Sequence, residues 1–231
     1  MSTLDNTTAA VIAPPGNEVA NAIATEMRQQ GCHVTLATAG DASPAEFDAV
    51  VFVTGSPCEY NIAVSDISRY VGEILADAAI AVRLLPTDGL ASRSLVLVAP
   101  PVGAIFESGA TAISTVGGAL QGLSRALTVE LGEYGIRSNV VQPGIYEAAI
   151  KRASVIPTIP LERTEGLFTQ PLDIARAAVF LASDDASYIS GAIVDVDGGL
   201  SEDRHAIASV LWAEGITTAD ESWTEALLGH H

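Results

Sequence analysis

The stretch GGALQGLSRALTVELGEYGIRSNVVQPG, residues 117–144, contains the pattern that decides the fold. It continues a helical pattern over 111–134, in which large aliphatic side chains recur every three or four residues, and a strand over 137–141 follows. A second stripe of small side chains runs along the same helix, so we expect it to pack on its own sheet and on another helix. The large stripe is Ile113, Val116, Leu120, Leu123 and Leu127, and the small stripe is Thr115, Ala119, Gly122, Ala126 and Val129.

Outward from this stretch, short apolar runs alternate with amphipathic segments along the chain. Strands that alternate with helices predict an α/β protein, a doubly wound parallel sheet of about six strands with helices on both faces. The predicted strands are 9–13, 33–38, 49–55, 94–99, 137–141 and 192–196, and the predicted helices are 16–30, 65–83, 111–134 and 171–182. We expect one domain over 1–200 and an extension over 201–231 that is either a docked helix or an arm over a partner.

The charge balance excludes some partners. The 231 residues include 28 acidic and 11 basic side chains, a formal net charge of −17. A surface this negative repels phosphate backbones and anionic lipid, so we expect neither nucleic acid nor membrane as a partner. The sequence shows no apolar run of transmembrane length, no signal-peptide pattern and no metal-ligand cluster, which predicts a cytoplasmic protein.

Two further features carry little information. Cys32 and Cys58 stand without a CxxC or His-pair context, which is typical of reduced thiols. His230 and His231 end the chain as either native residues or a tag remnant.

Several motifs in the second half of the chain resemble one family. They are Gly135-Ile136-Arg137-Ser138-Asn139, Pro143-Gly144, Pro171-Leu172-Asp173-Ile174-Ala175, Phe180-Leu181-Ala182-Ser183, and Ser190-Gly191 followed by Val196-Asp197-Gly198-Gly199. Together they closely resemble the short-chain dehydrogenase/reductase family. The resemblance extends over residues 9–200, and its specific part is 117–199. It implies a Rossmann-like sheet and an oligomeric habit, but it does not by itself imply activity.

The turn after the first strand departs from that family. Rossmann proteins hold pyrophosphate with a glycine-rich turn at a helix N-terminus, and the family's turn reads T-G-x-x-x-G-x-G. In a gapless alignment the three glycine positions hold Pro14, Glu18 and Ala20, and Gly16 stands at a variable position. Pro14 and Pro15 remove two backbone donors, and Glu18 places a carboxylate where phosphate would sit, although it also suits a helix start. We therefore expect no nicotinamide cofactor.

The adenosine half of the cofactor site is also reduced. Only residues 41–48 separate the second predicted strand from the segment that resembles the family's fourth strand. In the family this interval holds a helix and an edge strand that form the adenine pocket. The resemblance therefore implies that the region of the family's third strand is shortened. Asp41 is the one acidic residue in the interval's opening loop, and a solvated role suits it.

The positions that correspond to the family's catalytic residues do not hold the family's catalytic residue types in this sequence. Hydride transfer at a carbinol needs a proton donor, and in the family a Tyr, a Lys, a Ser and an Asn provide and support it. By alignment these positions hold Ile113, Gly117, Pro100 and Glu73, in that order. Ser108, Ser114, Thr115 and Glu107 lie near the emptied site in sequence, without a neighbouring base that indicates a nucleophile. Tyr146 and Glu147 follow Pro143-Gly144, where the resemblance implies contacts to cofactor and substrate, and a surface or lid role suits both.

The leading hypothesis is a non-catalytic subunit that assembles with an active short-chain dehydrogenase. The resemblance suggests hydroxyacyl- or ketoacyl-CoA as the substrate class of that partner. In the family, the helix like 111–134 and the strand like 192–197 form the main subunit contacts, and these segments resemble the family best. The expected interface residues are Ala119, Leu120, Gly122, Leu123, Ala126, Leu127, Val194 and Val196. The partner is an active subunit in a heterotetramer, or a second copy in a homodimer or homotetramer.

Two other function classes stay open at this point. One is a divergent enzyme with a repurposed site, an oxidoreductase or a lyase-like enzyme, in which Glu73 or Glu107 has a shifted pKa. The other is a ligand-sensing regulatory module. A plain NAD(P)-dependent oxidoreductase requires that the gapless alignment be wrong.

Overall fold

The computed structural model describes residues 4–42, 46–54, 64–101, 111–144 and 169–199. These residues form one six-stranded parallel sheet with strand order β2-β1-β3-β4-β5-β6. The strands are β1 (Thr8–Ile12), β2 (His33–Ala37), β3 (Ala49–Val53), β4 (Arg93–Val98), β5 (Ile136–Pro143) and β6 (Ile193–Val196). The helices are α1 (Glu18–Gln29), α2 (Ile67–Val82), α3 (Thr111–Glu130) and α5 (Pro171–Ala182). The predicted Rossmann-like α/β class is confirmed.

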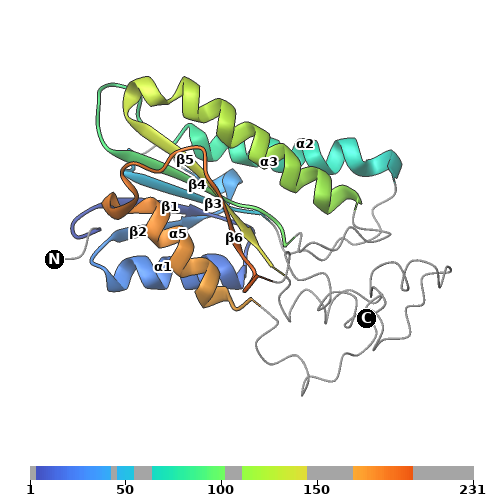
Figure 1. The fold of residues 1–231 in the computed structure, drawn as a ribbon, viewed down its shortest axis with the longest axis horizontal. Helices are drawn as coiled ribbons and strands as arrows, with labels where there is room; N and C mark the ends of the chain where they lie inside the picture. The colour runs from blue at the N-terminus through green and yellow to red at the C-terminus, as the bar shows by residue number, and fades with distance from the viewer. Residues whose placement is uncertain (1–3, 43–45, 55–63, 102–110, 145–168, 200–231) are drawn as a thin grey trace, which may run out of the picture.

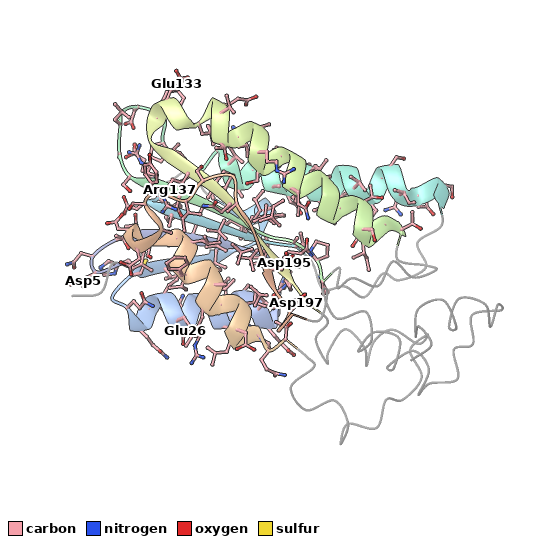
Figure 2. All side chains as sticks on the ribbon, viewed as in Figure 1. Asp5, Glu26, Glu133, Arg137, Asp195 and Asp197 are labelled. Carbon is pink, nitrogen blue, oxygen red and sulfur yellow. The ribbon has the colours of Figure 1, made fainter. Side chains whose placement is uncertain are left out.

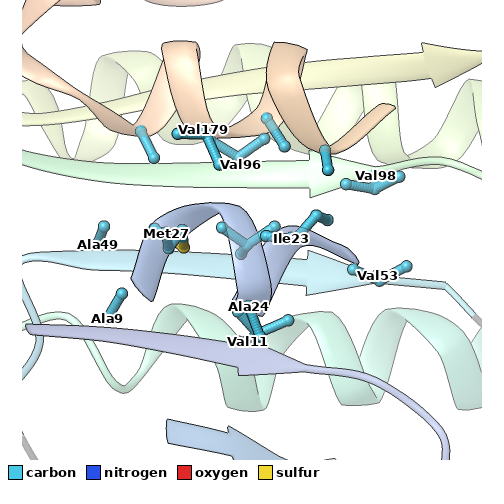
Figure 3. Packing of buried hydrophobic residues seen from close by; sticks show 14 of the residues in the cluster. Ala9, Val11, Ile23, Ala24, Met27, Ala49, Val53, Val96, Val98 and Val179 are labelled. Atoms are coloured by element: carbon cyan, nitrogen blue, oxygen red, sulfur yellow. The ribbon is translucent and has the colours of Figure 1, made fainter. Parts of the chain in front are cut away.

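Helices cover both faces of the sheet. Helices α1 and α5 lie side by side on one face, and α2 and α3 lie on the other (Figure 1). Each layer has its own apolar core. In the first, Ile23 and Met27 of α1 are fully buried against Val11, Val96 and Val179 (Figure 3). Burial of each such large side chain stabilises the fold by about 1.5–3 kcal/mol.

Most predicted boundaries lie within two residues of the observed ones. The largest difference is the predicted helix over 111–134, because α3 ends at Glu130 and a 3-10 turn spans Gly132–Tyr134. Gly135 ends this turn with φ 75°, where a Cβ atom would lie 2.6 Å from the Ala91 carbonyl oxygen. The chain therefore turns from α3 into β5 at a residue that must be glycine.

Strand β2 forms an edge of the sheet, as the shortened interval predicts. The family's additional strand has no counterpart beyond β2 among the residues that the structure describes. The β2 side chains are only half-buried or exposed, and Leu36 is 43% exposed although it points to the α1 face, in register with Val11. Arg28 at the end of α1 donates to the Val34 carbonyl and covers one acceptor of this edge.

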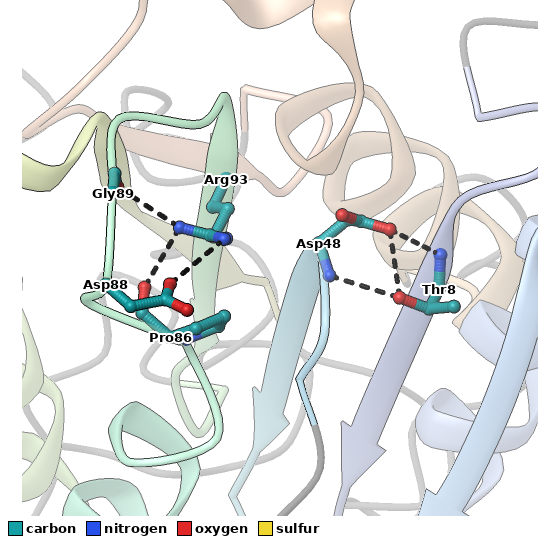
Figure 4. Close-up of polar contacts among 6 residues, drawn as sticks. All are labelled: Thr8, Asp48, Pro86, Asp88, Gly89 and Arg93. Carbon is teal, nitrogen blue, oxygen red and sulfur yellow. Dashed lines mark hydrogen bonds and ion pairs between the residues drawn. The ribbon is translucent and has the colours of Figure 1, made fainter.

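Side chains fix the amino-terminal edge of the sheet. A carboxylate oxygen of Asp48 accepts from the Thr8 amide at 2.8 Å and from the Thr8 hydroxyl at 2.9 Å, which joins the starts of β1 and β3 (Figure 4). Arg93 at the start of β4 donates to the Pro86 and Gly89 carbonyls. These contacts stabilise the fold at the edge opposite to the one where ligands bind in such sheets.

Buried Arg137 joins β5 to the end of α5. Its guanidinium donates to the Leu181 carbonyl at 2.8 Å and to the Ser183 carbonyl at 3.0 Å (Figure 2). Asn139, two residues on, donates to the Ile189 carbonyl and accepts from the Ala192 amide. Burial lowers the pKa of Arg137, which stays charged because its ordinary value is so high. The Gly-Ile-Arg-Ser-Asn motif thus holds the connection from α5 to β6.

Several predictions fall on residues outside the described part. These are the extension over 201–231, Cys58, Glu107, Ser108, Tyr146, Glu147 and the terminal histidines. Among the described residues, no helix is both long and apolar enough to cross a membrane.

Candidate functional site

The turn between β1 and α1 lies at the point where the strand order reverses. Chain order runs from β1 outward to β2 and then returns past β1 to β3, and ligands of doubly wound sheets bind in the crevice at such a switch point. Pro14, Pro15 and Gly16 form the turn and are exposed, with Gly16 at φ 73°. Glu18 begins α1 with its carboxylate exposed, which is the helix-start role that the sequence suggested.

Asn17 closes this turn against the neighbouring strand. Its side-chain oxygen accepts from the Ala20 amide at 3.0 Å and so caps α1. Its side-chain nitrogen donates to the Thr54 carbonyl at 3.1 Å, just after β3. One residue therefore spans the switch point, and it takes up a backbone donor at the helix N-terminus where an anion would bind.

Three of the four catalytic positions lie together around the start of α3. Pro100 follows β4, and Ile113 and Gly117 lie in the first turns of α3, where both are buried. Gln142 in β5 donates to the Pro100 carbonyl at 2.8 Å, and Gln121 in α3 donates to the Gln142 side-chain oxygen at 3.4 Å. The described side chains here are apolar groups, the amides of Gln121 and Gln142, and the hydroxyls of Thr111, Ser114 and Thr115, so they provide hydrogen bonds but no titratable group.

The fourth position, Glu73, lies in a different place. It is in α2, where it pairs with Arg69 at 3.2 Å, and it lines a cleft of about 520 Å³ at the carboxyl ends of β1, β2 and β3. The cleft also contains the turn residues Pro14 and Pro15 but none of Pro100, Ile113 or Gly117. The structure thus separates Glu73 from the other three positions and joins it to the degenerate turn.

The cleft has an apolar floor and a charged wall. Ile12, Phe52, Val53 and Ile74 line it with aliphatic and aromatic surface. Arg69, Glu73 and Asp77 follow one another at four-residue spacing along α2, so they share a helix face. Burial raises the pKa of Asp77, and the nearby Glu73 carboxylate raises it further. Thr38, at the end of β2, donates to Asp41 and caps a short 3-10 turn.

Along α3 the two predicted stripes lie on opposite faces. Leu120 and Leu127, which were predicted to contact a partner, belong to the protein's own core, with 0% and 7% of their surface exposed. Leu123, Val194 and Val196 are half-buried and also pack on their own cores. The exposed residues of α3 are Thr111, Thr115, Gly118, Gly122, Arg125, Ala126, Val129 and Glu130, and Ala119 is half-buried beside them. Val129 is 80% exposed.

The remaining candidates have structural roles. Cys32 is buried and accepts a hydrogen bond from Thr7, and burial raises the pKa of its thiol, which favours the protonated form. No group of His, Cys, Asp and Glu side chains suited to a metal ion occurs within the described ranges.

A parallel sheet with a switch-point crevice and a second site at the start of α3 defines a Rossmann-like protein of the dehydrogenase type. A family model described as enoyl-(acyl carrier protein) reductase matches residues 78–201, more than half of the chain. The chain belongs to this family, and so to the short-chain dehydrogenases/reductases.

Solved structures agree on the fold. An oxidoreductase of the short-chain dehydrogenase/reductase family from Burkholderia thailandensis superposes with a TM-score of 0.72, covering 90% of this chain and 98% of that one at 21% identity. The ligand-free aldohexose dehydrogenase of Thermoplasma acidophilum gives a TM-score of 0.67, covering 88% and 97% at 20% identity.

Curated relatives match over a shorter range. A 4-formylbenzenesulfonate dehydrogenase of Comamonas testosteroni is 36% identical over 114 residues, 44% of this chain and 41% of that one. A (3R)-3-hydroxyacyl-CoA dehydrogenase of Canis lupus familiaris is 34% identical over 112 residues, 46% and 42% of the two chains. The matched part of this chain therefore spans less than half the length of these relatives.

Sequence reasoning missed two residues of these sites. Asn17 stands directly before the helical pattern, and the preference of Asn for N-caps could have identified the cap but not the bond to Thr54. The sequence did not predict the role of Gln142, because a polar residue inside an apolar strand does not indicate which group it will bind.

Proposed function

We propose that this protein is a non-catalytic member of its family that assembles with an active short-chain dehydrogenase and stabilises or completes it. The assembly is a hetero-oligomer built as a dimer of dimers. The observation that carries the proposal is Asn17, because its side chain occupies the switch point where the family's cofactor phosphates would lie.

The turn does not fit a dinucleotide. A pyrophosphate needs several backbone donors that converge at the start of α1. Here Pro14 and Pro15 provide none, the Ala20 amide is bound by Asn17, and Glu18 adds a negative charge at the same helix end. The nearby cleft adds the carboxylates Glu73 and Asp77, which also disfavour an anion.

The positions of proton transfer support the same conclusion. Ile113 is 1% exposed, so the side chain at the family's tyrosine position is closed off in the core and carries no proton. Gly117 provides no charge to lower a neighbouring pKa, and Pro100 has its carbonyl bound by Gln142. A hydride transfer has neither an acid nor a base among these residues.

The exposed face of α3 supports assembly. Gly118 and Gly122 lie inside the helix, and a Cβ atom at either position would meet nothing within 4 Å. Each glycine costs about 1 kcal/mol relative to alanine in a helix interior, and the isolated chain gains no packing in return. The close approach of a partner helix would offset this cost, because small side chains let helix backbones come near one another.

The experiment is affinity purification of the tagged chain from its native cells, followed by mass spectrometry of every chain retained. We expect a short-chain dehydrogenase in stoichiometric amount, and relatives named for 3-hydroxyacyl-CoA and 3-oxoacyl-carrier substrates suggest an acyl thioester as its substrate. Gly122→Glu is the disrupting variant, and Glu130→Gln at the end of α3 is the control. A stable homo-oligomer that retains no dehydrogenase would overturn the proposed assembly.

Cofactor binding is tested separately by thermal shift with NAD⁺, NADH, NADP⁺ and NADPH. A ligand at a hundredfold excess over its Kd stabilises the folded state by about 2.7 kcal/mol. We expect no shift for this chain and a clear shift for a catalytically active family member measured in parallel. A saturable shift that Pro14→Gly strengthens would show that the turn still holds a dinucleotide.

A further inference from the structure

The cleft between α2 and the sheet has the size and lining of a small-molecule site. Its volume of about 520 Å³ lies within the range of about 300–1,000 Å³ typical of such sites. Its floor is the buried apolar surface of Ile12, Phe52 and Val53, and Ile74 of α2 continues that surface up the wall. The body of a ligand that fits here is apolar or aromatic.

The wall of the cleft has an excess of negative charge. It contains two carboxylates, Glu73 and Asp77, and one guanidinium, Arg69. Arg69 is already paired with Glu73 at 3.2 Å. Among the described residues that line the cleft, Arg69 is the only cation. Asp77 is an exposed residue of α2, and its partial burial and the nearby Glu73 carboxylate raise its pKa.

The net charge of the whole chain also favours a cationic ligand. At −17 the protein attracts small cations and repels phosphates. An ammonium group could pair with Asp77 while an aromatic body covers Phe52 and Ile74. The same placement would set a phosphate against two carboxylates.

We propose that this cleft binds a small organic cation with an aromatic or apolar body, an aromatic amine in the simplest case. Its apolar floor holds the body, and Asp77 pairs with the ammonium group. The site is separate from the emptied catalytic positions at the start of α3, and binding does not require a partner subunit.

The test is isothermal titration of the full chain with tryptamine. Tryptophol, which has a hydroxyl in place of the ammonium group, and indole-3-propionate, which carries a carboxylate, are the matched ligands. We expect saturable 1:1 binding of tryptamine and no binding of indole-3-propionate. Tryptophol should bind about tenfold more weakly than tryptamine, because it cannot form the charge-assisted hydrogen bond to Asp77.

Two variants locate the site. Asp77→Asn removes the charge and keeps the shape, and we expect it to weaken tryptamine binding by about tenfold and to leave tryptophol unchanged. Glu130→Gln makes the same change of charge outside the cleft and should bind tryptamine like the native chain. Thermal melts of both variants establish that they are folded.

Each contrary result has a defined meaning. No saturation at millimolar tryptamine, equal affinity for tryptophol, or equal loss in Asp77→Asn and Glu130→Gln would each overturn the proposal and leave the non-catalytic role standing. If NADH displaced bound tryptamine, the cleft would hold a nucleotide, and the proposed function would fail as well.

Discussion

The β1–β3 side and the β5–β6 side of this sheet differ in which family features they retain. On the first side Pro14, Pro15 and Gly16 form the turn after β1, Asn17 spans the switch point and β2 is the edge. On the second side the Gly-Ile-Arg-Ser-Asn motif is intact, and Arg137 and Asn139 bind carbonyls of the connection from α5 to β6. The motif that identifies the family most specifically here has a structural role, so it can persist without the chemistry.

The largest expected effect is a loss of stability on the β5–β6 side of the sheet. Arg137→Ala leaves the buried Leu181 and Ser183 carbonyls without their donor, and we expect a loss of about 3 kcal/mol in the free energy of unfolding. Arg93→Ala is the control, because it removes similar bonds to carbonyls near the surface and should cost about 1 kcal/mol. Urea denaturation measures both, and equal losses would show that Arg137 does not have a special role.

A second change tests close packing on the same side. Gly144→Ala would place a Cβ atom 2.6 Å from the Asp197 Cβ and 2.8 Å from its Cα, so the ends of β5 and β6 must separate. We expect a destabilisation of about 2 kcal/mol by thermal or urea unfolding. An unchanged midpoint would mean that the two strand ends move apart freely.

On the altered side, Asn17→Ala removes the cap of α1 and the bond to Thr54. We expect a loss of about 1–2 kcal/mol in the free energy of unfolding. Asn21→Ala, an exposed position one turn further along α1, is the matched control and should be neutral or slightly stabilising. The idea of a closed switch point fails if Asn17→Ala behaves like Asn21→Ala.

Gly122→Ala separates the isolated chain from its assembly. In the isolated chain the new methyl group meets nothing within 4 Å, so helix propensity predicts a gain of about 1 kcal/mol in stability. In the assembly the same methyl group keeps the partner helix away, so retention of the dehydrogenase should fall. Melting curves measure the stability of the isolated chain, and affinity purification measures how much dehydrogenase it retains. A rise in both quantities would show that α3 is not part of the interface.

The smallest expected effect is at the cleft. The folded-state pKa of Asp77 is raised, so its ionisation destabilises the fold as the pH rises above the unfolded-state pKa of the carboxyl. Asp77→Asn should therefore raise the melting temperature slightly at pH 7 and have no effect at a pH low enough to protonate Asp77 in both states. A gain that is constant across pH would have another cause.

Local patterns were sufficient to predict the elements of the fold. The apolar runs gave all six strands, and the two-faced pattern of α3 gave its buried stripe. The burial of Leu120 and Leu127 in the chain's own core could not be predicted, because a helical stripe shows which residues share a face but not whether that face meets the chain's own sheet or a partner. The group of Arg69, Glu73 and Asp77 is visible as a spacing, but its position opposite Phe52 is not.

The sequence by itself determined the α/β class and the places of its helices and strands, because these depend on side-chain identity and local periodicity. Only the tertiary structure showed that Asn17 reaches Thr54 and that Glu73 lines a cleft that does not include Pro100. These depend on contacts between segments far apart in the chain, and the local periodicity of a sequence does not specify which distant segments meet.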